Sequence, residues 1–348
     1  MSTMQAWRTQ QYGPPLDALK LEDVPLPEPG DKEVLVRVHG IPLNLNDLER
    51  VMGGNMMVEP ELPYSPGMEV MGIVDSCGAG AESWQGKRVV GITAGAHGGF
   101  AQYAVCPIVS LFEVPETIPL PDAAALFFPF HLAWLGLYDR ADLQADETVL
   151  IHAAAGGAGS AAIQLAKLRG AKVIATAGSD EKLALCRDLG ADEVVNYQKE
   201  EFDSRVMEYT NKRGVEVVFD NVGESVMEKS MNCLAYNGRY VMNGFASDKT
   251  VADEKFLVPR RIALGNFRLC GVLLAYADDA TGPFIKEAMG WNFPHRTLGE
   301  SIMREVCSLV EQGKLRAVIG QTAAFADLPQ CVQDMADRKT SGRVVITV

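Results

Sequence analysis

The sequence has no closely spaced cysteine pair, no long uninterrupted apolar run and no excess of basic residues. Its seven cysteines form no CxxC-type motif, which excludes short metal and redox motifs, and their odd number indicates reduced thiols in a cytoplasmic protein. The longest apolar stretch, 123–138, contains Pro129 and His131 and predicts a buried core segment rather than a membrane span. Because the N-terminus also lacks the apolar stretch of a secretory signal, we expect no membrane partner.

Acidic residues outnumber basic ones by 45 to 32, which leaves a formal charge of −13. A field of this sign repels polyanions, so we expect no nucleic-acid partner. The hydrophobic fraction of 47% is that of a globular protein and excludes a largely disordered chain. A length of 348 residues predicts about two domains.

Two sequence patterns divide the chain. Over 34–114, short β-branched runs alternate with proline and glycine, which predicts a small β-rich domain. After Pro121, strand patterns alternate with helical patterns, which predicts right-handed crossovers and a doubly wound parallel sheet. The expected strands are 148–152, 172–176, 193–196, 215–220, 239–244 and 267–277, and the expected helices are 161–168, 180–190, 225–238, 285–293 and 300–313. A final strand over 343–348 is expected to rejoin the sheet of the first domain.

A glycine-rich turn links the strand at 148–152 to the helix that follows. In the G-x-G-x-x-G frame it has Ala154 at the first position, then Gly156 and Gly159. Gly156 would let the backbone approach a pyrophosphate at the helix N-terminus, with Gly157 and Ala158 beside it, and Gly159 would let the helix lie close to the strand. The turn predicts a dinucleotide site; a tight turn without a ligand and a methyltransferase are the alternatives.

The end of the second strand bears on which dinucleotide binds. An NAD site places an acidic residue there to bind the ribose 2′-hydroxyl, whereas this chain has Ala177, Gly178 and Ser179. These small residues leave room for a 2′-phosphate, and Lys182 supplies a cation, so NADPH is favoured over NADH. The neighbouring Asp180 and Glu181 weigh against this; alternatively they are first-turn helix residues with Ser179 as the N-cap.

Motifs over nearly the whole chain resemble the medium-chain dehydrogenase/reductase superfamily, and within it the zinc-free quinone oxidoreductase branch typified by zeta-crystallin. HAAAGG-x-G followed by GA-x-x-x-x-NY is specific for that branch. The segments that carry the resemblance are PLNLNDLERVMGG (42–54), PGMEVMGIVDSCGAG (66–80), GGFAQYAV (98–105), DAAALFFPFHLAWLGL (122–137), HAAAGGAGSAAIQLAK (152–167), GADEVVNY (190–197), VVFDNVG (217–223) and TSGRVVITV (340–348).

The resemblance implies a Rossmann domain inserted into a GroES-like β-rich catalytic domain. We expect the GroES-like part over 1–124 and 280–348, the Rossmann NADP-binding part over 125–279, and a homodimer. Carried over position by position, the 2′-phosphate site falls on Ser179, Lys182 and Tyr197. Further cofactor contacts are implied for Asn221, Asn243, Gly244, Phe245 and Arg343, the last of them to the pyrophosphate.

Two residues stand where zinc-dependent members of the superfamily carry metal ligands. Asn44 replaces a cysteine and Met68 replaces a histidine, so the resemblance implies that no metal is bound. Without a Lewis acid, easily reduced acceptors such as quinones and activated enones are favoured. Asn44 and Asp47 are the candidate catalytic residues. Asn44 would donate from its amide to the acceptor oxygen or only hold a turn, and Asp47 would fix the loop or cap the following helix.

The sequence therefore predicts an NADPH-dependent reductase of a quinone or an α,β-unsaturated carbonyl compound, with that small molecule as its partner. One alternative is an enoyl thioester reductase, although the catalytic tyrosine of that branch is missing and only Tyr64 lies nearby. The other is a nucleotide-binding protein without turnover, because a fold alone does not secure activity.

Overall fold

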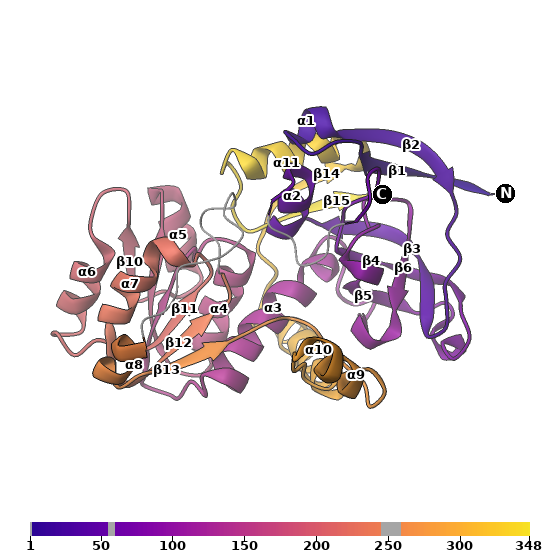
Figure 1. The fold of residues 1–348 in the computed structure, drawn as a ribbon. Coiled ribbons are helices and arrows are strands. Elements are labelled where there is room, and N and C mark those ends of the chain that lie inside the picture. Colours follow the sequence, from indigo (N-terminus) through magenta and orange to yellow (C-terminus); the bar gives the residue numbers. More distant parts are fainter. Residues whose placement is uncertain (1, 55–59, 245–258) are drawn as a thin grey trace. The chain divides into compact units, whose positions relative to one another are not determined.

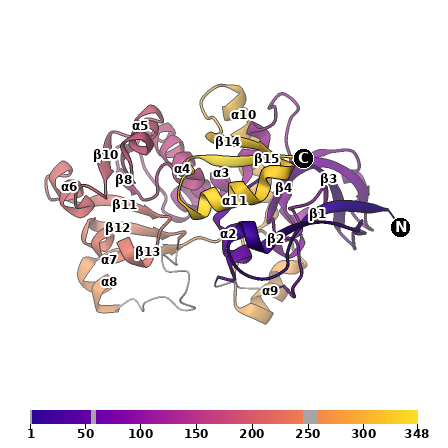
Figure 2. The same ribbon diagram turned by 90° about the horizontal axis from the view of Figure 1, so that it is seen from above.

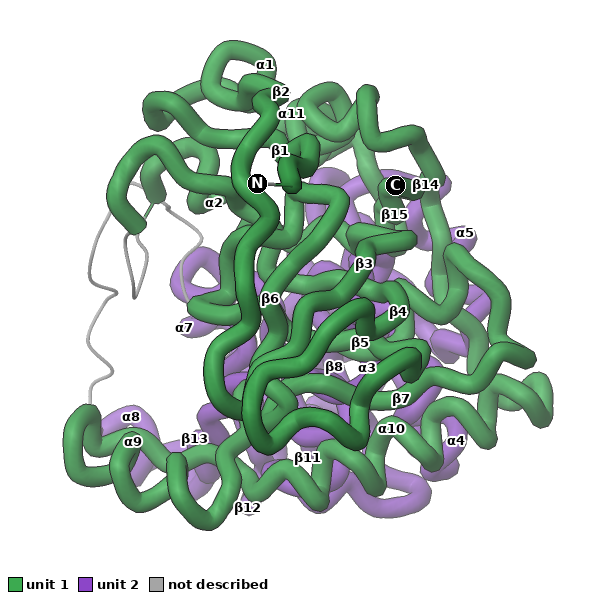
Figure 3. The backbone as a smooth tube through the Cα atoms, turned by 90° about the vertical axis from the view of Figure 1, so that its right-hand side faces the viewer, with its two compact units in different colours: residues 1–128, 275–348 green, residues 129–274 purple. Residues whose placement is uncertain are grey.

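The computed structural model describes residues 2–54, 60–244 and 259–348. The chain forms two units, residues 1–128 with 275–348 and residues 129–274 (Figure 3). These limits differ by a few residues from the predicted 124/125 and 279/280 boundaries. Helix α3 (Phe127–Trp134) begins in the last residues of the first segment and continues into unit 2.

Unit 2 contains a six-stranded parallel sheet with the order β10-β9-β8-β11-β12-β13. Figures 1 and 2 show the helices of this unit gathered around the sheet. The strands are β8 (Thr148–Ile151), β9 (Lys172–Ala177), β10 (Glu193–Asn196), β11 (Val215–Asp220), β12 (Leu234–Met242) and β13 (Arg268–Gly271). The helices are α4 (Gly157–Leu168), α5 (Asp180–Asp188), α6 (Phe202–Tyr209), α7 (Glu224–Asn232) and α8 (Pro259–Gly265), and a π-helix covers Leu135–Arg140.

This strand order reverses direction between β8 and β11, where an open α/β sheet binds its ligand beyond the carboxyl ends of the strands. Strands β9 and β11 are buried along nearly their whole length, as expected for parallel strands covered on both faces. Their apolar side chains, with Tyr240 and Phe202, form the core of unit 2. The predicted doubly wound sheet is confirmed.

Unit 1 is built on a mostly antiparallel sheet with the order β14-β15-β3-β4-β5-β7, in which β6 also pairs with β3. Its strands are β3 (Glu33–Pro42), β4 (Glu69–Cys77), β5 (Arg88–Ile92), β6 (Tyr103–Pro107), β7 (Leu111–Glu113), β14 (Ile319–Ala324) and β15 (Arg343–Thr347), and β1 (Thr3–Thr9) pairs with β2 (Leu19–Pro25) apart from it. The helices are α1 (Pro15–Ala18), α2 (Leu45–Met52), α9 (Thr281–Met289), α10 (Arg296–Glu311) and α11 (Leu328–Ala336). Single 3₁₀ turns cover Glu82–Trp84, Ala94–Ala96, Ile108–Ser110, Asp122–Ala125 and Phe325–Asp327.

The C-terminal strand β15 runs antiparallel to β3, with Ile346 opposite Ile41. The prediction that the last strand rejoins the first sheet is therefore confirmed. Buried β-branched residues of both strands, among them Val38, Ile41 and Ile346, lie in one core cluster.

Several predicted elements end earlier than expected, among them α9, which ends at Met289 and not at residue 293. The helix expected over 225–238 stops at Asn232, because Leu234 already pairs with Val215 in the sheet. Strand pairing thus overrides the helical propensity of this segment. The strand expected over 267–277 ends at Gly271. Helix α6, over Phe202–Tyr209, lies in a segment where the sequence predicts no element.

Candidate functional site

The glycine turn lies at the carboxyl end of β8, where the strand order reverses. Gly156 is the N-cap of α4, and Ala153 before it adopts a left-handed conformation with a φ of 49°. The backbone N–H of Ala154 donates to the carbonyl of Thr176 at 3.0 Å, which ties the turn to β9. The first N–H groups of an α-helix have no intrahelical acceptor, so Gly157, Ala158 and Gly159 present donors to an anion.

Gly156 and Gly159 differ in how closely neighbouring atoms surround them. A Cβ on Gly159 would lie 2.4 Å from the carbonyl oxygen of Ala153 and 2.6 Å from the Cα of Ala154, so only glycine fits. This close approach accounts for the predicted packing of helix against strand. A Cβ on Gly156 would meet only the Ala153 oxygen at 3.3 Å. Gly156 is thus less constrained by the protein itself, as expected if its space serves a ligand.

Three residues predicted to bind a 2′-phosphate lie together at the carboxyl ends of β9 and β10. Ser179 caps α5, and its Oγ accepts from the N–H of Lys182 at 3.3 Å, which confirms the N-cap interpretation. A Cβ on Gly178 would lie 2.6 Å from the Tyr197 Oη, so the phenol rests against this glycine. Tyr197 nevertheless keeps 48% of its surface exposed and is accessible to a ligand.

Asp180, one of the two acidic residues that weigh against NADPH, has its charge compensated. The Asp180 carboxylate pairs with Lys199 Nζ at 2.5 Å and accepts from Asn196 Nδ2 at 2.9 Å. The hydrogen bond from Lys199 is the largest of the effects that lower the pKa of Asp180. Its charge is therefore partly neutralised before any ligand binds.

The carboxyl ends of β11 and β12 bring Asn221, Asn243 and Gly244 together. Asn221 Nδ2 donates to the carbonyl of His152 at 3.0 Å. The N–H groups of Asn243 and Gly244 donate to the Asp220 carbonyl, and a Cβ on Gly244 would lie 2.1 Å from the Asn221 carbonyl carbon. Phe245, expected to continue this group, lies outside the described residues.

The Asp220 carboxylate holds the loop that follows β11. Its carboxylate accepts from Tyr240 Oη at 2.5 Å and from the backbone N–H groups of Val222 at 2.8 Å and Gly223 at 3.1 Å. Burial raises the pKa of Asp220, and these hydrogen bonds oppose the shift. Because its side chain is fully buried and bonded inward, Asp220 shapes the loop rather than contacting a ligand.

In unit 1 the predicted catalytic residue Asn44 belongs to a buried polar network. Its amide Nδ2 donates to the Pro42 carbonyl at 3.1 Å and to Glu69 Oε2 at 3.0 Å, and its Oδ1 accepts from Arg343 at 2.8 Å. These contacts fit the alternative that Asn44 holds a turn. To donate to the oxygen of a substrate, the Asn44 amide would have to give up its hydrogen bond to either the Pro42 carbonyl or Glu69.

The N-cap residue of helix α2 is Asn44, not Asp47, and the Asp47 side chain takes part in its capping box. Asp47 is the third residue of the helix, and its carboxylate accepts from the backbone N–H groups of Asn44 and Met68, both at 2.9 Å. Burial raises the pKa of Asp47, and the hydrogen bond from Asn44 is the largest opposing effect. The carboxylate thus ties the start of α2 to the segment before β4, as the loop-fixing interpretation expects.

Arg343 is buried at the start of strand β15. Its guanidinium donates to Glu69 Oε2 at 2.6 Å and to Asn44 Oδ1, and its side chain is only 7% exposed. Glu69 is fully buried and also accepts from the Phe128 N–H at 3.1 Å. Burial raises the pKa of Glu69, while Arg343 lowers it. This arrangement speaks against the expected pyrophosphate contact, because Arg343 is already committed to a buried carboxylate.

Glu69 and His152 are site residues whose roles the sequence does not predict. Glu69 is a charged residue at the head of the apolar run VMGIV, and a charge in a buried strand is a signal for a polar network. His152 is the first residue of the HAAAGG motif, where only the alanines and glycines received a structural interpretation. Tyr64, considered as a replacement catalytic tyrosine, is 6% exposed and donates to the Arg50 carbonyl at 2.9 Å.

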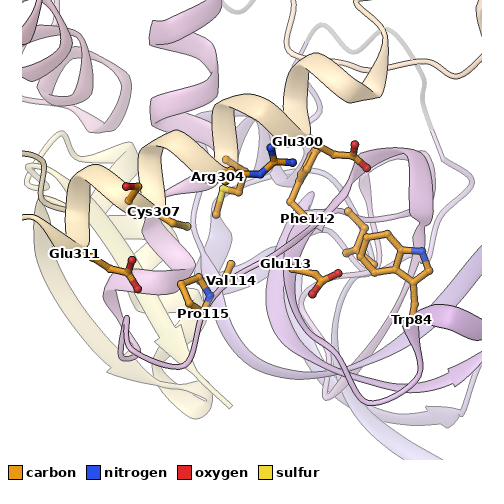
Figure 4. A pocket seen from close by; sticks show the side chains of 12 residues that line it. Trp84, Phe112, Glu113, Val114, Pro115, Glu300, Arg304, Cys307 and Glu311 are labelled. Atoms are coloured by element: carbon orange, nitrogen blue, oxygen red, sulfur yellow. The ribbon is translucent and has the colours of Figure 1, made fainter.

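Within residues 2–54, 60–244 and 259–348, no three His, Cys, Asp or Glu side chains come together in a way that could hold a metal ion. No helix of the same segments is both long and apolar enough to cross a bilayer. A cavity of about 650 Å³ lies in unit 1 between α10 and β7 (Figure 4). Its lining includes Trp84, Phe112 and Cys307 but none of the predicted site residues.

Comparison with known proteins gives two family matches. Residues 30–116 match the alcohol dehydrogenase GroES-like domain, and residues 157–288 match the zinc-binding dehydrogenase family. A quinone oxidoreductase of Pseudomonas aeruginosa is 31% identical over 335 residues, which are 96% of this chain and 97% of that protein. A human quinone oxidoreductase is 30% identical over 243 residues, 69% of this chain and 73% of its own length.

Solved structures agree with these sequence matches. A mycobacterial protein solved in complex with NADPH has a TM-score of 0.85 and 29% identity, and the match covers 99% of this chain and all of that one. A quinone oxidoreductase from Pseudomonas syringae has a TM-score of 0.84 and 27% identity over the same shares of both chains. The predicted combination of a GroES-like and a Rossmann domain is thereby confirmed.

Proposed function

Because this chain belongs to the quinone oxidoreductase branch of the medium-chain dehydrogenase/reductase superfamily, we propose that it transfers hydride from NADPH to a quinone or an α,β-unsaturated carbonyl compound without a metal ion. The observation that carries the proposal is the convergence at one sheet edge of the glycine turn, the Ser179–Tyr197 group and the Asn221–Gly244 group. This edge is the ligand-binding position of an open parallel sheet.

The residues present fit a dinucleotide. The N–H groups at the start of α4 suit a pyrophosphate, and the close contact at Gly159 holds them in place. Asn221, Asn243 and Gly244 would hold the remainder of the cofactor. When bound, NADPH supplies the hydride; the protein supplies position, charge complementarity and exclusion of water.

The preference for NADPH over NADH rests on charge. Ser179 offers a hydroxyl, Lys182 a cation and Tyr197 an exposed phenol, while Lys199 and Asn196 compensate Asp180. A 2′-phosphate carries about two negative charges, so a nearby cation favours it strongly. A ribose hydroxyl gains little from the same cation.

Independence from metal is supported by the donor set around Asn44. The carboxylate there, Glu69, is bound to Arg343 at 2.6 Å, and Asn44 and Met68 are not zinc ligands. We assign to Asn44 and Asp47 a positioning role: they hold the start of α2 against the segment before β4. Hydride transfer then depends on placing an already electron-poor acceptor, which favours quinones and enones.

The test is to mix the protein with NADPH and a panel of quinones, enones and enoyl thioesters, following the absorbance of the reduced nicotinamide. We expect oxidation with quinones or enones, unchanged after dialysis against a chelator. Faster turnover of enoyl thioesters would favour the thioester reductase instead. Tight NADPH binding with no oxidation by any acceptor would favour a non-catalytic nucleotide-binding protein, and loss of activity to the chelator would contradict metal independence.

The proposal includes a cytoplasmic homodimer. Among the described residues of unit 2, strand β13 is hydrogen-bonded to β12 on one side and ends the sheet order, so it offers an edge for pairing with a second copy. Light scattering coupled to size exclusion would show a mass of two chains. A single-chain mass at micromolar concentration would contradict the dimer.

A further inference from the structure

His152 is the first residue after β8 and is buried, with 1% of its surface exposed. Its ring Nδ1 lies 3.0 Å from Thr176 Oγ1, and its Nε2 lies 2.8 Å from Ser230 Oγ. Its backbone carbonyl accepts from Asn221 Nδ2 at 3.0 Å, and its N–H donates to the Phe219 carbonyl. One residue thus joins β8, β9, α7 and the loop after β11.

The hydrogen bonds around the ring assign its tautomer. Ser230 Oγ donates its single proton to the Val226 carbonyl at 2.7 Å, so toward the histidine it can only accept. The proton of the imidazole is therefore on Nε2, and Nδ1 accepts from the Thr176 hydroxyl. Both ring nitrogens are satisfied by uncharged partners in this arrangement.

The ring also stays uncharged. Burial lowers the pKa of His152 to about 3, and its aromatic neighbour is Phe202, with ring centroids 4.8 Å apart. The neutral imidazole can bond to the Thr176 and Ser230 hydroxyls in one arrangement only, with Nδ1 as the acceptor and Nε2 as the donor. It therefore behaves as a rigid connection at neutral pH.

The partners of His152 continue directly into the three groups of the proposed cofactor edge. Thr176 precedes Gly178 and Ser179 by two and three positions, and its own carbonyl accepts from Ala154 in the glycine turn. Asn221 is bonded to the His152 carbonyl. Displacing the imidazole would thus shift the glycine turn, the 2′-phosphate group and the Asn221 loop relative to one another.

We propose that His152 is a positioning residue that sets the spacing of these three groups and thereby both the affinity for the dinucleotide and the discrimination of NADPH from NADH. The inference rests on the proposed cofactor site. His152 touches no ligand itself; it acts through Thr176, Ser230 and Asn221.

Two substitutions separate this role from simple core filling. His152→Leu keeps an apolar volume but removes both ring contacts, whereas His152→Asn keeps an acceptor near Nδ1 for Thr176. Thr210→Val is the matched control, because Thr210 is a buried residue of unit 2 whose hydroxyl donates to the Val206 carbonyl and accepts from the Gly214 N–H, before the amino end of β11.

Each variant is titrated with NADPH and with NADH by fluorescence, and its stability is measured by urea denaturation. We expect His152→Leu to raise the NADPH dissociation constant by about tenfold or more and to reduce the preference over NADH, in line with the loss of a supporting hydrogen-bond partner. His152→Asn should recover part of the preference. Thr210→Val should lose stability without a change in either dissociation constant.

An NADPH dissociation constant for His152→Leu within twofold of wild type would overturn the inference, and so would an equal effect from Thr210→Val. If His152→Leu does not fold, Thr176→Val replaces it, with the expectation that NADPH affinity falls more than NADH affinity and with equal loss for both as the contrary result. Failure of the wild-type protein to bind NADPH would instead contradict the proposed function.

Discussion

Arg343 and Glu69 form an ion pair of 2.6 Å in which neither side chain has more than 7% of its surface exposed. They come from β15 and β4, far apart in sequence and two strands apart in the sheet of unit 1. Asn44 completes the network by bonding to both. A buried pair of this kind is costly to break, because the remaining charge keeps its desolvation penalty without a partner.

We therefore expect Arg343→Met to lower the free energy of unfolding by about 3–5 kcal/mol. Arg343→Met combined with Glu69→Gln should be less destabilising than Arg343→Met alone, since neither member of the pair then carries an unpaired charge. The exposed pair Lys87–Glu113 is the control, and Lys87→Ala should cost under about 1 kcal/mol. Urea denaturation measures all three, and equal losses for the buried and exposed pairs would contradict the description of the network.

Lys182→Ala should weaken NADPH binding by about tenfold or more while leaving NADH binding nearly unchanged, because only the 2′-phosphate needs the cation. Lys172→Ala is the matched control: Lys172 is exposed at the opposite, amino end of β9, so its loss should change neither affinity. Calorimetric titration with both cofactors measures the effect. An equal loss for NADH would show that Lys182 does not act on the 2′-phosphate.

Gly156 and Gly159 should respond differently to substitution by alanine. Gly159→Ala places a Cβ 2.4 Å from a backbone oxygen and should cost about 1–3 kcal/mol of stability. Gly156→Ala meets that oxygen only at 3.3 Å, so it should fold nearly as well as wild type but bind NADPH more weakly. Thermal unfolding with and without NADPH separates the two effects, and a Gly156→Ala protein with undiminished stabilisation by NADPH would be the contrary result.

Acid should destabilise unit 2 through His131 and His152. Burial lowers the pKa of each to about 3, whereas an unfolded histidine takes up its proton near pH 6.5. Between these values the unfolded state binds more protons, so stability is full above the unfolded pKa and is lost as the pH falls toward 3. Each histidine contributes up to about 1.4 kcal/mol per pH unit.

The buried carboxylates Asp47, Glu69 and Asp220 have raised pKa values and act in the opposite direction, so the histidine contribution is read as a difference between proteins. Urea denaturation of wild type and His152→Asn at pH 7.5 and 5.5, about one unit either side of the histidine value, gives that difference. The wild type should lose more stability than the variant on acidification. Parallel losses would show that His152 does not remain neutral in the folded protein.

The sequence predicts the sheet of unit 2 well, because its buried strands and helical segments alternate with clear turn residues. The grouping of Ser179, Lys182 and Tyr197 follows only from the resemblance to the family, and in the structure these residues lie beyond the carboxyl ends of the neighbouring strands β9 and β10. The sequence does not predict the network of Asn44, Glu69 and Arg343. Those residues are widely separated along the chain, and the pairing of both β15 and β4 with β3 brings them together.

Arg343 was expected to contact the pyrophosphate, and the sequence does not predict its ion pair with Glu69 for the same reason. A cation in a C-terminal segment is compatible with solvent, with a phosphate or with a buried carboxylate, and local sequence does not distinguish these. For Asp47, the spacing from Asn44 fits both an N-cap and the third residue of a helix. The left-handed Gly53 at the end of α2 fixes only where the helix stops.

The most direct test of the whole account is a calorimetric titration of the purified protein with NADPH, followed by NADH under the same conditions. We expect one NADPH site per chain, with an affinity at least about tenfold higher than for NADH. Absence of NADPH binding, or equal affinity for the two nucleotides, would contradict it.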